Sequence, residues 1–433
     1  MENKEQLIDE ILSRGVAEVI DREHLKKRLL EGKPLRIKLG IDPTSPNIHL
    51  GRSVPLLKLR DFQDLGHTVV FIVGDFTGQI GDTSDKDSER PMLSEDLVKK
   101  NMESYLEQAY KILNRNQTEV HFNSKWLSQL TLKNISELSS WFSLNEFISR
   151  ENIRKRLDTG KHVSLRELLY PLMQGYDSIR VDADVELGGT DQRFNLLAGR
   201  ELQRRHMVSL DERSEIEDSI GHQPLHRSGE RIHNRIDGVD GTPQDILMTN
   251  LILGTDGRKM SSSWGNTINL TDVPNEMFGK VMSVPDNLIT DYFVHCTRVP
   301  MTEVGKMAEE MVTGGNPRDA KVRLAKEIVR LYHGDAEADK AEQYFIETFS
   351  KGNIPTDIQA TSVNSQHENI VETIVSMKFA TSKSDAMRKI EQGGVSIDGV
   401  KVSPNDIQWN KERHEGKVMK VGKKNFVKVT FSL

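Results

Sequence analysis

Two apolar segments near the N-terminus constrain the fold most, because each runs directly into a turn rich in proline, glycine or polar residues. Residues 35–41 lead into the turn at 42–46 and then into an amphipathic helix expected to extend to about Asp64. Residues 67–73 are continuously apolar, as in a parallel strand covered on both faces, and end in a glycine-rich stretch at 74–82. With a further strand expected at 118–122, this alternation predicts an α/β fold with a Rossmann-like parallel sheet.

The turn after the first strand contains a candidate phosphate site. Where a strand leads into a helix, free backbone N–H groups and the positive end of the helix dipole face a ligand. His49 can donate a hydrogen bond to a phosphoryl oxygen there, and Gly51 permits a close approach to the backbone. Taken alone, His49 could equally cap or cover an ordinary helix, and residues 74–82 could be a plain glycine-rich turn.

A second candidate site lies in the segment Tyr-Pro-Leu-Met-Gln-Gly-Tyr-Asp. Tyr170, Gln174 and Asp177 are spaced by four and three residues and therefore share one face of a helix. A phenol, an amide and a carboxylate suit an amino-acid ligand, whose ammonium can meet Tyr170 and Gln174. Asp177 can accept a hydrogen bond from a substrate phenol. A substrate without that hydroxyl would leave a buried carboxylate unsatisfied.

Two later turns complete the candidate site. A strand at 185–187 leads into Gly-Gly-Thr-Asp-Gln, where Asp191 suits ribose hydroxyls and Gln192 can reach the amino acid. Residues 256–263, Asp-Gly-Arg-Lys-Met-Ser-Ser-Ser, form a glycine-bearing loop with one lysine at its centre and three hydroxyls. Such a loop can follow a phosphate as charge moves during a reaction.

These segments together resemble one family. HLG at 49–51 and KMSSS at 259–263 resemble the HIGH and KMSKS signatures of class I aminoacyl-tRNA synthetases, whose paired loops hold the triphosphate of ATP. HLG, GDFTGQIGD, YPLMQGYD, GGTDQ and DGRKMSSS, in this order, look like the bacterial tyrosyl-tRNA synthetases, and the similarity extends over nearly the whole chain. The resemblance implies activation of L-tyrosine by ATP with Mg²⁺, transfer to tRNA(Tyr), and a homodimer without a tightly bound cofactor.

The resemblance also implies a role for particular residues. The expected catalytic residues are His49, Arg52 and Lys259. The expected ATP contacts are Thr44, His49, Gly51, Gly189, Asp191, Lys259 and Ser261. The expected tyrosine contacts are Lys38, Asp82, Tyr170, Gln174, Asp177 and Gln192. The expected tRNA contacts are Lys86, Arg90, Lys383, Arg388 and Lys389.

Three residues depart from the family pattern. Arg52 stands where the first signature usually has its second histidine, and this permanent cation should favour phosphate binding. Ser262 replaces the second lysine of KMSKS, a spelling that the family tolerates. Lys38 occupies a position that is tyrosine in part of the family, which suggests a different hold on the substrate at that wall.

The remainder of the chain divides by composition. We expect a catalytic domain at 1–274, with helices over 4–31 and 95–113 and a polar excursion at about 209–241. The resemblance implies a helical anticodon-side domain at 275–350 and an S-four-like RNA-binding module at 370–433, and the polar composition between them predicts a linker at 351–369. Residues 371–433 contain 12 lysine and arginine residues against 7 acidic ones, although the whole chain has a net charge of -6. A basic end on an acidic body is typical of a chain that meets a polyanion.

Composition excludes several other classes of protein. No run approaches the roughly 18 to 20 apolar residues that cross a bilayer, so we expect no membrane segment and a cytoplasmic location. Cys296 is the only cysteine, which excludes an intramolecular disulfide, and the three histidines of the excursion have no metal-ligand spacing. Two alternatives remain. One is a tryptophan-activating relative, disfavoured by Asp177 and the basic tail. The other is an RNA-binding paralogue that no longer catalyses, suggested by Arg52, Ser262 and the long excursion.

Overall fold

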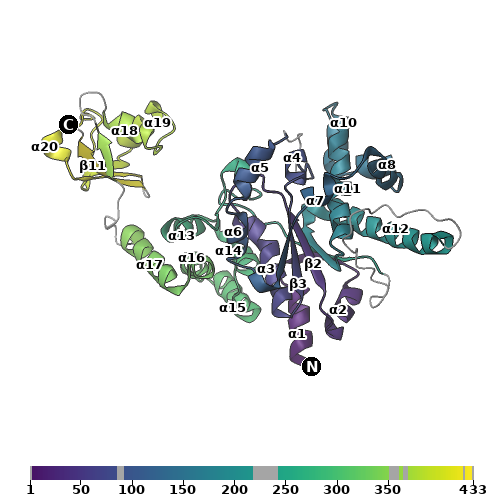
Figure 1. Cartoon of the computed structure of the whole chain (residues 1–433). Helices are drawn as coiled ribbons and strands as arrows, with labels where there is room; N and C mark the ends of the chain where they lie inside the picture. The colour runs from purple at the N-terminus through teal and green to yellow at the C-terminus, as the bar shows by residue number, and fades with distance from the viewer. Residues whose placement is uncertain are drawn as a thin grey trace. The chain divides into compact units, whose positions relative to one another are not determined.

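The computed structural model describes residues 2–84, 92–217, 242–350, 360–363, 369–422 and 425–431. The chain forms two compact units, residues 1–332 and 333–433 (Figure 1). No described helix is long and apolar enough to cross a membrane. The sequence-derived domain boundaries at 274, 350 and 369 stay predictions.

The first unit is built around a six-stranded sheet in the order β1-β6-β5-β2-β3-β4. All neighbouring strands run parallel except β1, which pairs antiparallel with β6 at one edge. Its strands are β1 Val16–Ile20, β2 Arg36–Ile41, β3 Thr68–Val73, β4 Thr118–Phe122, β5 Val185–Gly189 and β6 Asp245–Thr249. The predicted Rossmann-like α/β architecture is therefore confirmed.

Helices cover both faces of this sheet, with α3 and α14 to one side and α11 and α12 to the other (Figure 1). The helices before residue 150 are α1 Glu2–Ile11, α2 Arg22–Glu31, α3 Leu50–Asp64, α4 Thr77–Ile80, α5 Glu95–Met102, α6 Tyr105–Ala109, α7 Ser124–Leu127, α8 Leu132–Ser140 and α9 Leu144–Ile148. The later ones are α10 Glu151–Asp158, α11 Leu165–Arg180, α12 Arg193–Glu217, α13 Pro274–Met282, α14 Ile289–Cys296, α15 Met301–Val312 and α16 Pro317–His333.

The core explains why these strands form where they do. Every residue of β3 from Val69 to Val73 is buried, as a parallel strand between two helical layers requires. The helix predicted to end at about Asp64 ends there. Trp141 and Phe142 pack against the cluster of Phe147, Leu172 and Leu202.

Three expectations about elements of the first unit need correction. The segment 4–31 is not wholly helical, because Val16–Ile20 is strand β1, whose β-branched residues pair with β6. The helix expected at 95–113 is two helices, α5 and α6, separated at residues 103–104. The excursion expected from 209 begins as helix, because α12 continues to Glu217; residues 218–241 lie outside the described residues.

The second unit contains a five-stranded sheet in the order β7-β11-β10-β8-β9. Its elements are α17 Asp335–Phe345, a π-helical stretch Ile346–Ser350, β7 Ala360–Val363, α18 Ile370–Ser376, α19 Lys383–Glu391, β8 Val395–Ile397, β9 Val400–Lys401, α20 Lys411–His414, β10 Val418–Val421 and β11 Asn425–Phe431. Within the segment expected to form the S-four-like module, α19 is followed by the hairpin of β8 and β9. Within the segment expected as a linker, 351–369, residues 360–363 form β7, which pairs in parallel with β11.

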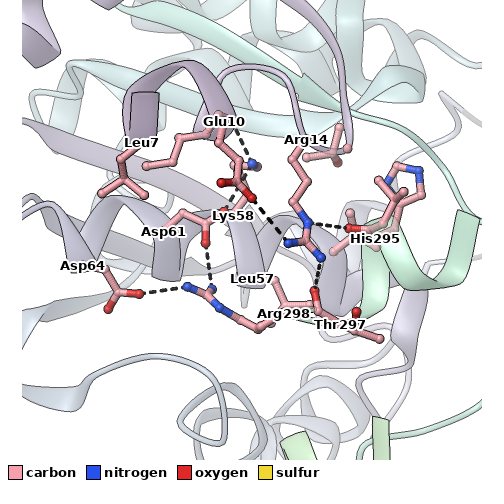
Figure 2. Close-up of a pocket in the computed structure, with 15 residues that line it drawn as sticks. Leu7, Glu10, Arg14, Leu57, Lys58, Asp61, Asp64, His295, Thr297 and Arg298 are labelled. Carbon is pink, nitrogen blue, oxygen red and sulfur yellow. Dashed lines mark hydrogen bonds and ion pairs between the residues drawn. The ribbon is translucent and has the colours of Figure 1, made fainter. Parts of the chain in front are cut away.

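A charged cavity of about 170 Å³ lies between α1, α3 and the end of α14 (Figure 2). Arg14 donates to the carbonyl oxygens of Val294 at 3.0 Å and Thr297 at 2.7 Å. The guanidinium of Arg298 pairs with Asp61 at 2.7 Å and with Asp64 at 2.9 Å, on α3. These bonds fasten the end of α14 to α3 and to the turn that follows α1.

Candidate functional site

The register of the sheet places four polar loops at one edge. Ile41 of β2 lies opposite Val73 of β3, and Gly189 of β5 lies opposite Thr249 of β6. Because parallel strands end at the same edge, the segments after residues 41, 73, 189 and 249 are neighbours there. This edge is where open α/β sheets bind their ligands.

A cavity of about 530 Å³ opens at this edge. Twelve of the fourteen residues predicted for catalysis, ATP or tyrosine line it. They are Thr44, His49, Gly51, Arg52, Asp82, Tyr170, Gln174, Gly189, Asp191, Gln192, Lys259 and Ser261. Residues more than two hundred positions apart in the sequence therefore share one cavity, and only Lys38 and Asp177 of the predicted set do not line it.

The two signature loops touch each other. The backbone N–H of Gly51 donates to the sulfur of Met260 at 3.3 Å, and the hydroxyls of Ser45 and Ser262 lie 3.3 Å apart. A β-bridge between His49 and Asn269 ties the first loop to the segment that follows the second. The phenol of Tyr292 on α14 donates to the carbonyl of Leu253 at 2.6 Å, which anchors the base of the KMSSS loop.

His49 occupies the N-cap position of α3, yet its side chain makes no capping hydrogen bond. It is buried and its Nδ1 has no hydrogen-bond partner. Burial, reinforced by the charges of Arg52 and Lys259, lowers the pKa of His49 to about 3. The imidazole is therefore neutral at physiological pH and offers a hydrogen bond without a charge. The capping alternative does not describe this residue.

Lys259 of the KMSSS loop pairs with Asp191 at 3.1 Å. Asp191 follows β5 in a short 3₁₀ turn, Thr190–Gln192. Gly189 has no room for a side chain, since a Cβ there would lie 2.5 Å from the Asp191 carboxylate and 2.8 Å from Leu251. The predicted phosphate and ribose residues thus lie together at one side of the cavity.

A second group of polar side chains comes from α11, from the start of α12 and from the turns after β3 and β5. Gln192 donates from Nε2 to Asp82 at 2.7 Å, and Asn195 donates to Gln192 at 3.0 Å and to Gln174 at 3.1 Å. Tyr170 donates to Asp42 at 2.8 Å. These side chains present carboxylate and amide oxygens, which are the acceptors that an ammonium group needs.

Lys38 points away from the cavity. Its side chain is fully buried, and Nζ donates to Glu186 at 2.8 Å, to Ser178 at 2.7 Å and to the carbonyl of Gln174 at 2.9 Å. The ammonium is therefore a partner of Glu186 behind the wall. Lys38 supports Gln174 from behind, and a direct contact with the substrate stays a prediction.

Asp177 also lies behind the cavity wall. It is buried and accepts hydrogen bonds from Trp126 Nε1 at 2.7 Å and from Asn123 at 3.2 Å. Burial raises the pKa of Asp177 to about 7, against the opposing effect of Lys38 and the two donors. Its predicted role as acceptor of a substrate phenol stays a prediction.

Asp42 was not among the residues predicted for the site, although it lines the same cavity. Its oxygens accept from Thr77 at 2.7 Å and from Tyr170 at 2.8 Å. Burial, with the nearby charge of Asp82, raises the pKa of Asp42 to about 6. Gly74 makes room for this carboxylate, because a Cβ there would lie 2.1 Å from it. An aspartate directly at a strand end was the available signal.

The residues predicted to contact tRNA fall in two places. Lys86 and Arg90 lie outside the described residues. Lys383, Arg388 and Lys389 lie on α19 of the second unit, and all three pair with carboxylates: Lys383 with Glu372 at 2.7 Å, the other two with Asp385 at 2.6 Å. Lys383 and Arg388 are exposed at 71% and 65%, so they are accessible to an anionic partner.

Comparison with known proteins agrees with this geometry. Residues 30–350 match the model of the family "tRNA synthetases class I (W and Y)". The chain therefore belongs to the class I tRNA synthetases of the tryptophan and tyrosine group, a class whose members use ATP. Residues 351–429 match the "Tyrosine--tRNA ligase SYY-like C-terminal domain". Within the class, the chain accordingly falls among the tyrosine–tRNA ligases.

Full-length relatives support the assignment to the tyrosine–tRNA ligases. The tyrosine–tRNA ligase of Haemophilus ducreyi is 41% identical over 97% of this chain and 97% of its own length. The tyrosine–tRNA ligase of Carboxydothermus hydrogenoformans is 43% identical over 99% of this chain and 98% of its own. The resemblance found in the sequence is confirmed over almost the whole chain.

Solved structures show the same fold at lower identity. A C-terminally truncated mitochondrial tyrosyl-tRNA synthetase of Coccidioides posadasii superimposes with a TM-score of 0.61 at 21% identity, covering 79% of this chain and 94% of that one. A tyrosyl-tRNA synthetase of Archaeoglobus fulgidus complexed with L-tyrosine gives a TM-score of 0.55 at 21% identity, covering 78% and 99%.

Proposed function

We propose that this chain activates L-tyrosine with ATP and transfers it to tRNA(Tyr), with the 530 Å³ cavity as its active site. In the first step the tyrosine carboxylate attacks the α-phosphate of ATP, and pyrophosphate leaves. In the second step a 3′-terminal ribose hydroxyl of the tRNA attacks the carbonyl of the adenylate, and AMP leaves. No side chain becomes covalently attached, so catalysis rests on positioning and on neutralising charge at phosphorus.

The phosphate side of this proposal rests on His49 and Lys259. Neutral His49 at the start of α3 donates a hydrogen bond, while Lys259 supplies a mobile positive charge as pyrophosphate leaves. Lys259 pairs with Asp191 on this side of the cavity, and ATP binding would replace this pair by contacts of Lys259 with the phosphates and of Asp191 with the ribose hydroxyls. Mg²⁺ enters the site bound to ATP, as part of the substrate.

The amino-acid side rests on the network of Asp82, Tyr170, Gln174 and Gln192. Its acceptor oxygens suit the tyrosine ammonium, and Tyr170 is fixed by its bond to Asp42. Asp177 is our candidate acceptor for the phenol, since Trp126 and Asn123 hold its carboxylate in a fixed orientation. A phenylalanine would leave this buried acid without that third donor.

The observation that carries the proposal is that one cavity joins the two signature loops to this amino-acid wall. The test is amino-acid-dependent ATP–pyrophosphate exchange on the purified chain, without tRNA. We expect exchange with tyrosine and not with phenylalanine or tryptophan. Exchange with tryptophan would point to the tryptophan-activating relative. No exchange from folded protein would favour a paralogue that binds RNA without catalysis.

A variant pair separates the two sides of the site. Lys259→Ala should lower exchange strongly while leaving the affinity for tyrosine unchanged, because Lys259 contacts the nucleotide side only. Gln174→Ala should weaken tyrosine binding itself, measured by calorimetry without ATP. Loss of tyrosine binding in Lys259→Ala would contradict the roles assigned here.

Homodimerisation belongs to the same proposal. Leu132, Leu144 and Leu165 each begin a helix of the 132–180 region and are exposed at 80%, 64% and 77%. These exposed apolar side chains are the observation that supports a subunit contact. Light scattering on the full chain should give twice the mass of the monomer. A cytoplasmic location and tRNA contacts by Lys86, Arg90, Lys383, Arg388 and Lys389 stay predictions.

A further inference from the structure

Arg52, the departure from the family signature, is bound to the turn at residues 42–48. Its Nη2 donates to the hydroxyl of Thr44 at 2.8 Å, and its Nη1 donates to the backbone carbonyl of Asp42 at 3.2 Å. Nη1 also donates to the phenol oxygen of Tyr105. Three hydrogen bonds of one guanidinium thus point at the turn and at the helix behind it.

Tyr105 belongs to a buried polar face that supports the same turn. Asn101, Tyr105 and Gln108 are spaced by four and three residues across α5 and α6, and all three are buried. Asn101 donates to the carbonyl of Pro43 at 2.9 Å, and Gln108 donates to the carbonyl of Pro46 at 2.9 Å. Buried polar groups need such partners, so this face and the turn stabilise each other.

The turn connects the two substrate sides of the cavity through Asp42. Arg52 holds the backbone carbonyl of Asp42, while the carboxylate of Asp42 accepts from Tyr170 at 2.8 Å and from Thr77 at 2.7 Å. Thr44, two residues later, faces the nucleotide side. A displacement of this turn would therefore move a predicted ATP contact and a predicted tyrosine contact together.

We propose that Arg52 and Tyr105 form a clamp that positions the 42–48 turn, and that Arg52 acts through this clamp on both substrates. The inference rests on the proposed function. A guanidinium can hold several acceptors at once because its donors form a rigid fork, whereas a lysine ammonium is a point charge and a histidine ring has two nitrogens. The clamp therefore gives a reason for arginine at this position, together with its partner Tyr105.

The test measures tyrosine binding by calorimetry without ATP, alongside the KM for ATP in pyrophosphate exchange. The variants are Arg52→Lys, Tyr105→Phe and the double variant, with Lys259→Ala as the control for a residue on the nucleotide side. We expect Arg52→Lys and Tyr105→Phe each to weaken tyrosine binding about five- to tenfold, the effect of one lost hydrogen bond. The double variant should be little worse than either single one, because both break the same unit. Lys259→Ala should bind tyrosine as the wild type does.

A role limited to phosphate attraction gives the opposite pattern. Arg52→Lys would then retain tyrosine binding and change only the KM for ATP, and Tyr105→Phe would be neutral; this result overturns the clamp. Thermal denaturation verifies that each variant is folded. If Tyr105→Phe is not folded, the result for Arg52→Lys alone decides. A wild-type chain that binds no tyrosine refutes the proposed function, which is a distinguishable outcome.

Discussion

Replacing Lys38 by methionine tests how the amino-acid wall is supported. Methionine keeps the approximate length and volume but removes the charge. Glu186 is only 1% exposed in its side chain and would lose its cationic partner Lys38, which lies at 2.8 Å. Breaking one side of a buried ion pair costs about 3–5 kcal/mol. Ser178 and Gln174 still donate to Glu186, at 2.9 and 3.2 Å, so we expect a loss near 3 kcal/mol.

The assay is urea denaturation followed by tryptophan fluorescence, which reports on the first unit through Trp126 and Trp141. Lys38→Met combined with Glu186→Gln removes both charges and should recover most of the loss, to within about 1 kcal/mol of the wild type. Lys99→Met is the matched control, because Lys99 and its partner Glu95 are each 65% exposed and the midpoint should not move.

The same variant has a functional consequence. Glu186 accepts from Gln174, so an unbalanced carboxylate should disturb the amide that lines the cavity. We expect Lys38→Met to raise the KM for tyrosine more than the KM for ATP. The reasoning is refuted if Lys38→Met unfolds at the wild-type urea concentration, or if Glu186→Gln fails to rescue it.

Three further predictions follow from charge and topology. Because burial raises the pKa of Asp177 to about 7 from its ordinary 3.8, the folded state binds this proton more tightly than the unfolded chain. The ionisation of Asp177 therefore destabilises the folded state, and this destabilisation grows as pH rises through this range. The melting temperature of Asp177→Asn relative to the wild type should be higher at pH 8 than at pH 5. A difference that does not change with pH contradicts this prediction. Because the pKa of His49 is lowered to about 3, His49→Ala should reduce exchange without removing an inflection between about pH 5 and 8 from the pH–rate profile. Deleting 351–433, which removes β7 with the sheet it belongs to, should preserve pyrophosphate exchange and weaken tRNA charging; equal loss of both activities would show that the second unit supports catalysis.

The sequence was sufficient for the features that depend on local pattern. The segments at 35–41, 67–73 and 118–122 became β2, β3 and β4. The signal was strongest for β3, because a parallel strand covered on both faces needs a continuous apolar segment. The loops at their ends were recognisable as ligand sites, since parallel strands end at one edge of a sheet. Twelve predicted residues consequently line the same cavity.

Two edge strands, β1 and β7, were not predicted from the sequence. β1 and β7 are short and pair at a sheet edge, so their apolar pattern is weak and their pairing partners, β6 and β11, lie far along the chain. The break between α5 and α6 was also not predicted, because no residue at the break indicates it. The break accompanies the contacts of Asn101, Tyr105 and Gln108 with the 42–48 turn and Arg52, which are visible only in the structure.

Only the tertiary structure decided how the buried polar residues are used. The sequence predicted a substrate contact for Lys38, yet its ammonium meets Glu186, 148 positions away, behind the wall. Arg52 was expected to meet phosphate, and its donors hold the turn and Tyr105. The physical reason is that a hydrophobic pattern acts over neighbouring residues, whereas a buried charge takes whichever acceptor the packed fold brings within about 3 Å. The residues that line the site could therefore be predicted from the sequence, whereas the contacts that hold them in place could be found only in the tertiary structure.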